Sequence, residues 1–286
     1  MQIRLEHVHY TYQPGTAGEK HALRDVSLQL EQGEYVALVG STGSGKSTLV
    51  QLLNGLKQPT SGSILYDGLL IGNDKKALRQ IRCRVGLVFQ YPEYQLFDET
   101  VIRDVTFGPK NKGLSAEEAS RKAREALLQT GLPEELFGKS PFDLSGGEKR
   151  RAAIAGILAM EPEVLILDEP TAGLDPAGKV RILELIRRIR KETGCTILMV
   201  THNMDEAAEY AERILVMDEG QIILDGDPHE VFAREEQLKR IGLCLPQAAQ
   251  VCLDLGIRGC TTLEEAAKAI AEAFGPGHEV CSEISH

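Results

Sequence analysis

Two kinds of apolar pattern follow one another along the chain and predict its secondary structure. Near the start, apolar and polar residues alternate over 3–8 and 23–30, as in strands that bury one face, with a turn between them. Continuous apolar runs then predict buried strands at 35–39, 85–89, 164–167, 196–200 and 214–217. Helical patterns lie between these runs, at 46–54, 148–160 and 180–190. Because strands that alternate with helices form a parallel sheet, we expect an α/β fold.

The middle and the end of the chain depart from this alternation. Ser115 and Glu118 have the spacing of a capping box, which predicts a helix to about Thr130 and, with the helix at 148–160, a helical insertion at about 91–160. After residue 218 come a short strand, a turn, an alanine- and cysteine-rich tail and a capped helix from Thr262. We therefore expect a main domain at 1–218 and a small C-terminal extension at 219–286.

Charge and composition narrow the class of protein. The formal net charge is −10, which argues against a nucleic-acid partner, because such proteins carry a basic face. No segment approaches the run of about 18 apolar residues that a membrane span needs, and the N-terminus does not resemble a signal peptide. These features predict a soluble, cytosolic chain. Its six cysteines form no C-x-x-C pair, and we expect free thiols.

A glycine-rich turn follows the strand at 35–39 and precedes a helix. Its sequence, GSTGSGKS, has the G-x-x-x-x-G-K-[ST] form of a phosphate-binding loop in the required context. Glycines let successive N–H groups converge on one anion, the Lys46 ammonium can reach the β- and γ-phosphates, and the Ser47 hydroxyl can ligate Mg²⁺. The chain is therefore predicted to bind a nucleoside triphosphate. The expected nucleotide contacts in this phosphate loop are Gly40, Ser41, Thr42, Gly43, Ser44, Gly45, Lys46, Ser47 and the adjoining Thr48.

Two carboxylates end the buried strand at 164–167. Asp168 is placed to hold Mg²⁺, and Glu169 to act as a base on a water in line with the γ-phosphate. An acidic loop after a strand is by itself common, and only its combination with the phosphate loop favours catalysis.

A second anion site is indicated at Leu144–Glu148, where Ser145, Gly146 and Gly147 precede a helix that carries three basic residues. Ser-Gly-Gly alone is also a generic helix start. One triphosphate needs both anion sites only if two chains share it.

These features together resemble the ATP-binding subunit of ABC transporters, over about residues 3–220 and in the order of that family. The resemblance implies a P-loop NTPase core with a RecA-like mixed sheet, an N-terminal antiparallel β subdomain and a helical signature subdomain, Leu144–Glu148 being the signature loop. It implies that two such subunits pair head to tail, so that each phosphate loop faces the other chain's signature loop. Glu148 stands where many members have glutamine.

The same resemblance assigns roles to further residues. Gln90 would sense the γ-phosphate and Mg²⁺, and His202 would contact the γ-phosphate and hold the attacking water with Glu169. Asp175 would signal across the dimer. Tyr12 resembles the aromatic residue that stacks on adenine, with Tyr10 as a competitor.

A narrower resemblance, carried by residues 89–100 and 105–110, is to the ATPases of energy-coupling-factor importers of vitamins and metal ions, and to their second type. It implies a second, different ATPase chain as partner, a transmembrane coupling subunit, a membrane subunit that binds the substrate, and a peripheral location on the cytoplasmic face of the membrane. The C-terminal extension would help hold the two ATPases together. Five aromatic residues lie between 89 and 107, which favours a groove for a partner helix. The alternative is that some of them pack in the core of the helical insertion.

Three other functions compete with this one. A chromosome-maintenance or repair ATPase would need a coiled-coil insertion and a basic groove. A soluble kinase would explain the phosphate loop but neither the signature loop nor His202. An ATPase of another ABC importer, for cobalt, nickel or an amino acid, differs only in the 89–110 stretch and the tail.

Overall fold

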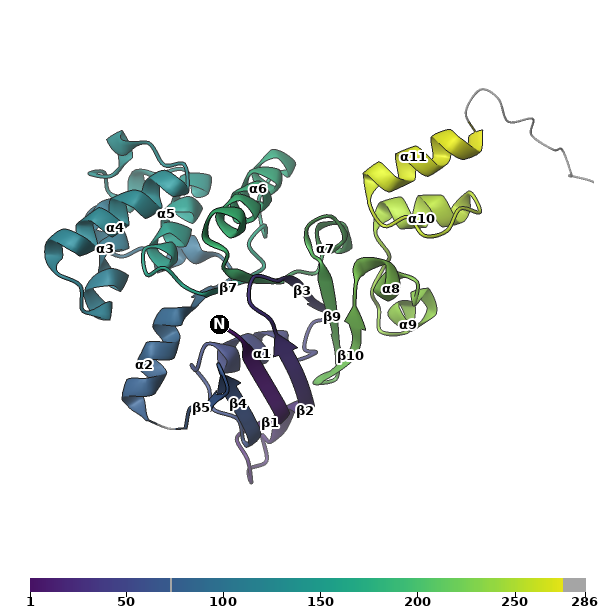
Figure 1. Ribbon diagram of the computed structural model, residues 1–286, viewed down its shortest axis with the longest axis horizontal. Helices are drawn as coiled ribbons and strands as arrows, with labels where there is room; N and C mark the ends of the chain where they lie inside the picture. Colours follow the sequence, from purple (N-terminus) through teal and green to yellow (C-terminus); the bar gives the residue numbers. More distant parts are fainter. Residues whose placement is uncertain (73, 275–286) are drawn as a thin grey trace, which may run out of the picture.

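Two β-sheets form the framework of the molecule (Figure 1). The computed structural model describes residues 1–72 and 74–274. A four-stranded antiparallel sheet has the strand order β2-β1-β4-β5, and a six-stranded core sheet has the order β10-β9-β3-β8-β7-β6. The strands are β1 (Ile3–Tyr12), β2 (Lys20–Leu30), β3 (Tyr35–Gly40), β4 (Ser61–Tyr66), β5 (Leu69–Leu70), β6 (Val85–Val88), β7 (Val164–Asp168), β8 (Thr196–Val200), β9 (Arg213–Asp218) and β10 (Gln221–Gly226). The expected α/β fold, with its N-terminal antiparallel subdomain and mixed core sheet, is confirmed.

Helices cover the core sheet, and further helices lie on two sides of it (Figure 1). They are α1 (Lys46–Leu53), α2 (Lys75–Arg84), α3 (Val101–Lys112), α4 (Ala116–Gln129), α5 (Gly146–Leu158), α6 (Pro176–Thr193), α7 (Met204–Tyr210), α8 (Pro228–Phe232), α9 (Glu235–Arg240), α10 (Gln247–Asp254) and α11 (Leu263–Phe274). Short 3₁₀ turns lie at η1 (Pro92–Gln95), η2 (Glu134–Leu136) and η3 (Pro141–Asp143). The capping box expected at Ser115 is present: its hydroxyl accepts from the Glu118 N–H at 3.2 Å.

Alternate residues of the core strands face two separate hydrophobic clusters. On β3, Val36 and Leu38 pack with α1 and the antiparallel sheet, whereas Ala37 and Val39 pack with the helices of the opposite layer. Because successive strand residues point to opposite faces, the continuous apolar runs are buried on both sides. The core sheet is thus the middle of three layers.

The helical insertion and the C-terminal region lie on opposite sides of this core in Figure 1. Helices α3, α4 and α5 pack on one another in the segment predicted as an insertion. Strand β10 lies beyond the predicted boundary at residue 218, yet it pairs with β9 in the core sheet. The division into 1–218 and 219–286 remains a prediction, and residues 275–286 lie outside the described residues.

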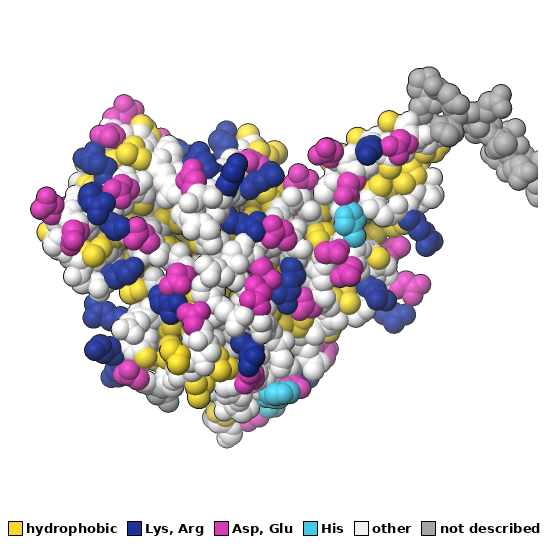
Figure 2. All heavy atoms as spheres, viewed as in Figure 1, with side chains coloured by type: hydrophobic (Ala, Val, Ile, Leu, Met, Phe, Trp, Pro, Cys, Tyr) yellow, Lys and Arg dark blue, Asp and Glu magenta, His cyan; other side chains and the backbone are white. Residues whose placement is uncertain are grey.

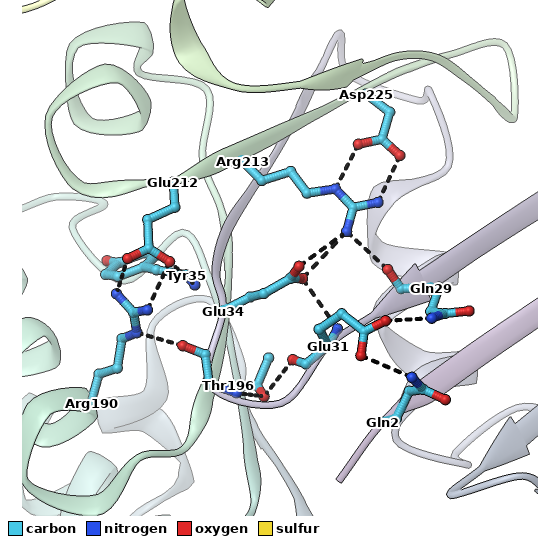
Figure 3. Close-up of polar contacts among 11 residues, drawn as sticks. Gln2, Gln29, Glu31, Glu34, Tyr35, Arg190, Thr196, Glu212, Arg213 and Asp225 are labelled. Carbon is cyan, nitrogen blue, oxygen red and sulfur yellow. Dashed lines mark hydrogen bonds and ion pairs between the residues drawn. The ribbon is translucent and has the colours of Figure 1, made fainter.

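A polar network fixes the turn that leads into β3 (Figure 3). Arg213 on β9 makes two hydrogen bonds to Asp225, at 2.6 and 2.7 Å, and donates to the Gln29 carbonyl at 3.0 Å. Arg190 on α6 contacts Glu212 through both terminal nitrogens and donates to the Gly33 carbonyl at 2.8 Å. Since β3 ends in the phosphate loop, this network anchors the strand that positions the loop.

The surface is mixed in charge. Figure 2 shows acidic and basic side chains interspersed over the visible face. Every helix in the described part of the chain is too short or too polar to cross a bilayer. Cys83, Cys195, Cys244, Cys252 and Cys260 are free thiols, and Cys281 lies outside the described residues.

Candidate active site

Four core strands deliver the predicted catalytic residues to one edge of the sheet. β3, β8, β7 and β6 are parallel neighbours in that order, so their carboxyl ends lie side by side. The phosphate loop follows β3, His202 follows β8, Asp168 and Glu169 end β7, and Gln90 follows β6. Residues far apart in sequence therefore meet at one place, as expected for a parallel sheet.

The phosphate loop requires glycine at its two ends. Gly40 has φ 153°, and a Cβ there would lie 2.3 Å from the Met217 carbonyl oxygen. Gly45 has φ 111°, and a Cβ there would lie 2.7 Å from the Ala22 carbonyl oxygen. Both positions combine a left-handed backbone with close backbone neighbours, which no other residue tolerates. The loop then passes directly into α1 at Lys46, so the helix N-terminus faces its concave side.

Polar groups in the loop fit a phosphate. The Ser44 hydroxyl is buried and has no hydrogen-bond partner among the described residues, and a phosphate oxygen would supply the acceptor. The Lys46 ammonium donates to the carbonyls of Gly40 and Ser41, at 2.7 and 2.9 Å. Burial lowers the pKa of Lys46, while the nearby Glu169 and Asp168 carboxylates oppose that shift. A bound anion would restore the ammonium's preference for its charged form.

Asp168 is a buried carboxyl in a negative environment. Burial raises its pKa, and the neighbouring Glu169 raises it further, although Lys46 acts in the opposite direction. A divalent cation would stabilise the charged form. The oxygen donors assigned to Mg²⁺, from Asp168, Ser47 and Gln90, are of the kind that this ion prefers.

Glu169 lies at the centre of a three-residue cluster. Its Oε2 accepts from the Gln90 side-chain amide at 2.9 Å, and its Oε1 lies 3.1 Å from His202 Nδ1. The Glu169 backbone has φ 49°, an uncommon left-handed conformation for a residue with a side chain. Such strain persists where surrounding contacts impose it, and it concentrates at functional sites. The structure thus brings together all three residues expected to act in catalysis.

A buried carboxylate binds residues next to this cluster in the sequence, and it was not identified from the sequence. Glu206 on α7 is 6% exposed and accepts hydrogen bonds from Thr171 at 2.9 and 3.0 Å and from Thr201 at 3.1 Å. Thr171 lies beyond Glu169 on one loop, and Thr201 precedes His202 on the next. The spacing of Asn203 and Glu206 at the start of α7 was the available sequence signal, since Asn203 caps that helix.

Tyr12 lies at the end of β1, near the helix that follows the phosphate loop. Its hydroxyl is 3.0 Å from the Thr48 hydroxyl, and its ring meets the Tyr10 ring edge-on with centroids 4.9 Å apart. The Lys57 ammonium lies over both rings, 4.7 Å from the Tyr12 centroid and 5.2 Å from the Tyr10 centroid. Tyr10 and Tyr12 thus form one aromatic unit.

The signature loop opens α5 with a capping box. Ser145 is the N-cap, and Glu148 accepts from the Ser145 N–H at 2.8 Å and from its hydroxyl at 2.6 Å. These bonds lower the pKa of Glu148, which stays ionised at neutral pH. Gly146 and Gly147, in the first turn, keep N–H groups without acceptors in the helix. Among the described residues, no hydrogen bond joins the signature loop to the phosphate loop.

Asp175 begins α6 and has an exposed side chain. Its carboxylate accepts from the Gly178 N–H at 2.6 Å and so caps the helix. A capping role accounts for this contact by itself, and the signalling role stays a prediction.

An apolar groove lies beside α5. It has a volume of about 410 Å³ and is lined by α2, the end of η1, α3 and α5, with Phe97, Phe107, Ile157 and Met160 among its walls. Phe97 and Phe107 meet edge-on, 5.2 Å between centroids, and both are more than half exposed, at 60% and 51%. We call this hollow the docking groove. Tyr94, which is 84% exposed, immediately precedes the lining residue Gln95. Most of the aromatics in this stretch are therefore surface residues rather than core.

Comparisons with known proteins agree with this geometry. Residues 23–172 match the family described as ABC transporter. The chain is 52% identical to the energy-coupling factor transporter ATP-binding protein EcfA2 of Clostridium perfringens, over 93% of each chain. Its identity to the EcfA2 of Bacillus cereus is 48%, over 99% of this chain and all of that one.

Solved structures show the same relationship. The cbiO1 protein of Clostridium perfringens, described as part of the ABC transporter complex cbiONQ, superposes with a TM-score of 0.75 at 42% identity, covering 89% of this chain and 98% of that one. A bacterial ABC transporter cassette solved as a dimer gives 0.70 at 32% identity, covering 79% and 98%.

Proposed function

Because the chain belongs to the ABC transporter family, as an energy-coupling factor transporter ATP-binding protein, we propose that its ATPase activity powers uptake of a vitamin or metal ion through membrane partner subunits. The observation that carries this proposal is the Gln90, Glu169 and His202 cluster beside the phosphate loop. The cluster and the phosphate loop lie at the same edge of the core sheet, which supports a role for these groups on a γ-phosphate held by the loop.

The chain's own groups divide the work of hydrolysis. The loop N–H groups and Lys46 bind the phosphates, and Tyr12 stacks on the base. Glu169 accepts the proton of the attacking water, and His202 holds that water and contacts the γ-phosphate. Mg²⁺, held by Ser47, Gln90 and Asp168, would neutralise charge on the phosphate oxygens when bound.

Two ATPase chains complete each site. Among the described residues, no hydrogen bond connects the phosphate loop of this chain to its signature loop. The N–H groups of Gly146 and Gly147, which have no acceptor within the helix, suit a phosphate bound by another chain. A head-to-tail dimer with a second, different ATPase would use these groups, with Asp175 at the interface and the 219–286 extension helping to hold the pair. The dimeric cassette among the structural relatives supports the pairing.

The docking groove suits a helix of a transmembrane coupling subunit. One of its exposed aromatics, Phe97, lies in the segment that follows Gln90, so a helix seated there would sense nucleotide-dependent motion. Such a chain works at the cytoplasmic face of the membrane, and a separate membrane subunit binds the substrate. An ATPase of another ABC importer, for cobalt, nickel or an amino acid, is the alternative, and it differs only in the 89–110 stretch and the tail.

The test compares two variants in the complex purified from detergent-solubilised membranes. Lys46→Ala should weaken ATP binding, because it removes the ammonium from the phosphate loop. Glu169→Gln should bind ATP normally but lose turnover by about a hundredfold or more, since an amide accepts no proton from water. ATP affinity, ATPase rate and the co-purifying membrane subunits are measured on the same samples.

Glu125→Gln, an exposed carboxylate on α4, is the matched control and should behave like the wild type. Normal ATPase activity in Glu169→Gln would refute the assignment of the base, and the absence of membrane subunits would argue for a function outside transport.

A further inference from the structure

One buried arginine joins three segments that carry functional residues. Arg150 lies in α5, shortly after the signature loop, and only 2% of its surface is exposed. A guanidinium is expensive to bury unless its hydrogen bonds are satisfied. Its partners therefore indicate what the burial achieves.

The first partner belongs to the segment that follows Gln90. Glu93, in η1, receives two hydrogen bonds from Arg150, from Nε at 3.2 Å and from Nη2 at 2.8 Å. This is a bidentate pair, which fixes orientation as well as distance. Glu93 is itself largely buried, with 16% of its side chain exposed.

The second set of partners lies in the turn between Glu169 and Asp175. Arg150 Nη1 donates to the carbonyls of Pro170 at 3.0 Å and Ala172 at 2.8 Å. The same turn lies close to the Gln90 segment, because a Cβ added at Gly173 would lie 3.4 Å from the Tyr91 ring. Tyr91 is held in a left-handed conformation, with φ 54°. The three segments thus form one packed unit around the guanidinium.

Helix α5 extends this unit to the docking groove. Ser145 begins the helix, Arg150 follows in its second turn, and Ala153, Gly156 and Ile157 further along line the groove. A displacement of α5 would therefore move both the signature loop at its start and the groove wall along its length.

We propose that Arg150 and Glu93 form a joint that makes the signature loop, the Gln90 segment and the Glu169–Asp175 turn move together. Arg150 is then a positioning residue: nucleotide contact at the signature loop moves Tyr91–Phe97 at the docking groove through this pair. The inference rests on the proposed function, because it assumes nucleotide binding between two ATPase chains.

Hydrogen–deuterium exchange of the full-length protein in its purified ATPase complex tests the joint. Exchange is measured with Mg²⁺, with and without a non-hydrolysable ATP analogue, in peptides covering Ser145–Lys149 and Tyr91–Phe97. In the wild type, nucleotide should slow exchange in both peptides. Arg150→Lys keeps the positive charge but cannot make the bidentate pair with Glu93. In this variant the slowing by nucleotide should persist at Ser145–Lys149 and shrink about tenfold at Tyr91–Phe97.

Glu93→Gln is the milder second variant and should give the same separation. The double variant should be no worse than the more severe single one, because both single variants weaken the same Arg150–Glu93 ion pair. Arg121→Lys, which alters an exposed ion pair within α4, is the control and should match the wild type.

The outcomes separate the joint from the function on which it rests. Unchanged slowing at Tyr91–Phe97 in both variants would overturn the joint and leave the proposed function standing. Faster exchange without nucleotide, equal in both peptides, would show that the pair only stabilises the fold, and would also overturn it. No slowing at Ser145–Lys149 in the wild type would overturn the shared nucleotide site, and the joint with it.

Discussion

Single residues at the active site hold conformations and charges that oppose stability. Glu169 has a positive φ, Ser44 buries a hydroxyl that has no partner among the described residues, and Asp168 keeps a carboxylate in a buried position. Each feature has a cost in the protein alone and a use when phosphate and Mg²⁺ are bound. Removing one of them should therefore raise stability and reduce function.

Asp168→Asn tests this trade-off. Burial, and secondarily Glu169, raises the Asp168 pKa above its unfolded value, so the carboxyl favours folding most at low pH and loses that contribution as pH rises through the folded pKa. The neutral amide avoids that loss. At pH 7 without Mg²⁺ we expect the variant to be more stable by about 1 kcal/mol, or roughly 2 °C in Tm.

The advantage should disappear below about pH 4, where the wild-type carboxyl is protonated. Mg²⁺-dependent ATP binding should fall in the same variant. Asp254→Asn, on the exposed surface of α10, is the control and should show neither effect. A variant less stable than the wild type at pH 7 would mean that the Asp168 charge supports the fold.

At the scale of strands and helices, the charged network around β3 connects the two sheets. Arg213 joins β9 to β10 through Asp225 and to the end of β2 through the Gln29 carbonyl (Figure 3). These contacts raise the pKa of Arg213, chiefly through its hydrogen bonds to Asp225. They lie at the far end of β3 from the phosphate loop.

Arg213→Ala should lower the free energy of unfolding by about 2 kcal/mol, because it leaves carboxylates and a carbonyl without their donor. Denaturant unfolding measures the loss. Affinity for ATP should change less than about twofold in the folded variant, since no phosphate ligand is touched. Arg240→Ala removes a surface pair that is 79% and 90% exposed and should cost almost nothing. Equal losses in the two variants would contradict a structural role for the network.

The sequence predicted elements best where one rule decided the outcome. The doubly buried strands, the capping box at Ser115 and the glycine-bounded loop followed from periodicity and local chemistry. Helices α2, α3 and α7 to α10 were not predicted individually, because their amphipathic patterns are short or depend on tertiary contacts. Helix α6 runs from Pro176 to Thr193, beyond both ends of the predicted 180–190, because Asp175 caps it and Gly194 ends it.

The resemblance to the family predicted which residues form the site. The order of parallel strands predicted that they lie at one edge of the sheet. The burial of Arg150 and Glu206 was beyond reach. The spacing of Asn203 and Glu206 marks the start of a helix, but nothing local shows that a charged helical residue points inward. Their burial is decided by the Pro170 and Ala172 carbonyls in one case and by Thr171 and Thr201 in the other. Such partners are known only when the whole chain is folded.

At the scale of the whole molecule, the proposed function needs a second chain at the signature loop. Gly147 has open space around it, with the nearest atom to an added Cβ, Arg151 Nη1, at 3.9 Å. An aspartate there should fit, and its charge favours the first turn of a helix, so Gly147→Asp should fold. The same charge repels a partner's γ-phosphate.

Gly147→Asp should therefore abolish ATP-dependent dimer closure while ATP binding at its own phosphate loop stays within about twofold. Size-exclusion chromatography with ATP in a Glu169→Gln background measures closure, and titration of labelled ATP measures binding. Gly147→Ala adds bulk without charge and should still close. If both variants fail equally, size rather than charge decides, and if binding and closure fall together, the shared-site proposal is wrong.

The proposed coupling to a membrane partner uses the docking groove, whose aromatic residues are exposed in the described part of the chain. Tyr94 and Phe97 follow Gln90 closely, and Phe97 packs edge-on against Phe107 in the groove wall. Replacing Tyr94 and Phe97 with serine removes apolar contact worth about 2–4 kcal/mol to a seated helix. ATP affinity should persist, because neither residue touches the phosphate loop, whereas transport in proteoliposomes and co-purification of the membrane subunit should fall. Leu128→Ser, an exposed apolar residue of α4 outside the groove, should leave both unchanged. Retained partner binding with lost ATP affinity would mean that the two aromatics support the active site rather than the interface, and the groove would then need another occupant.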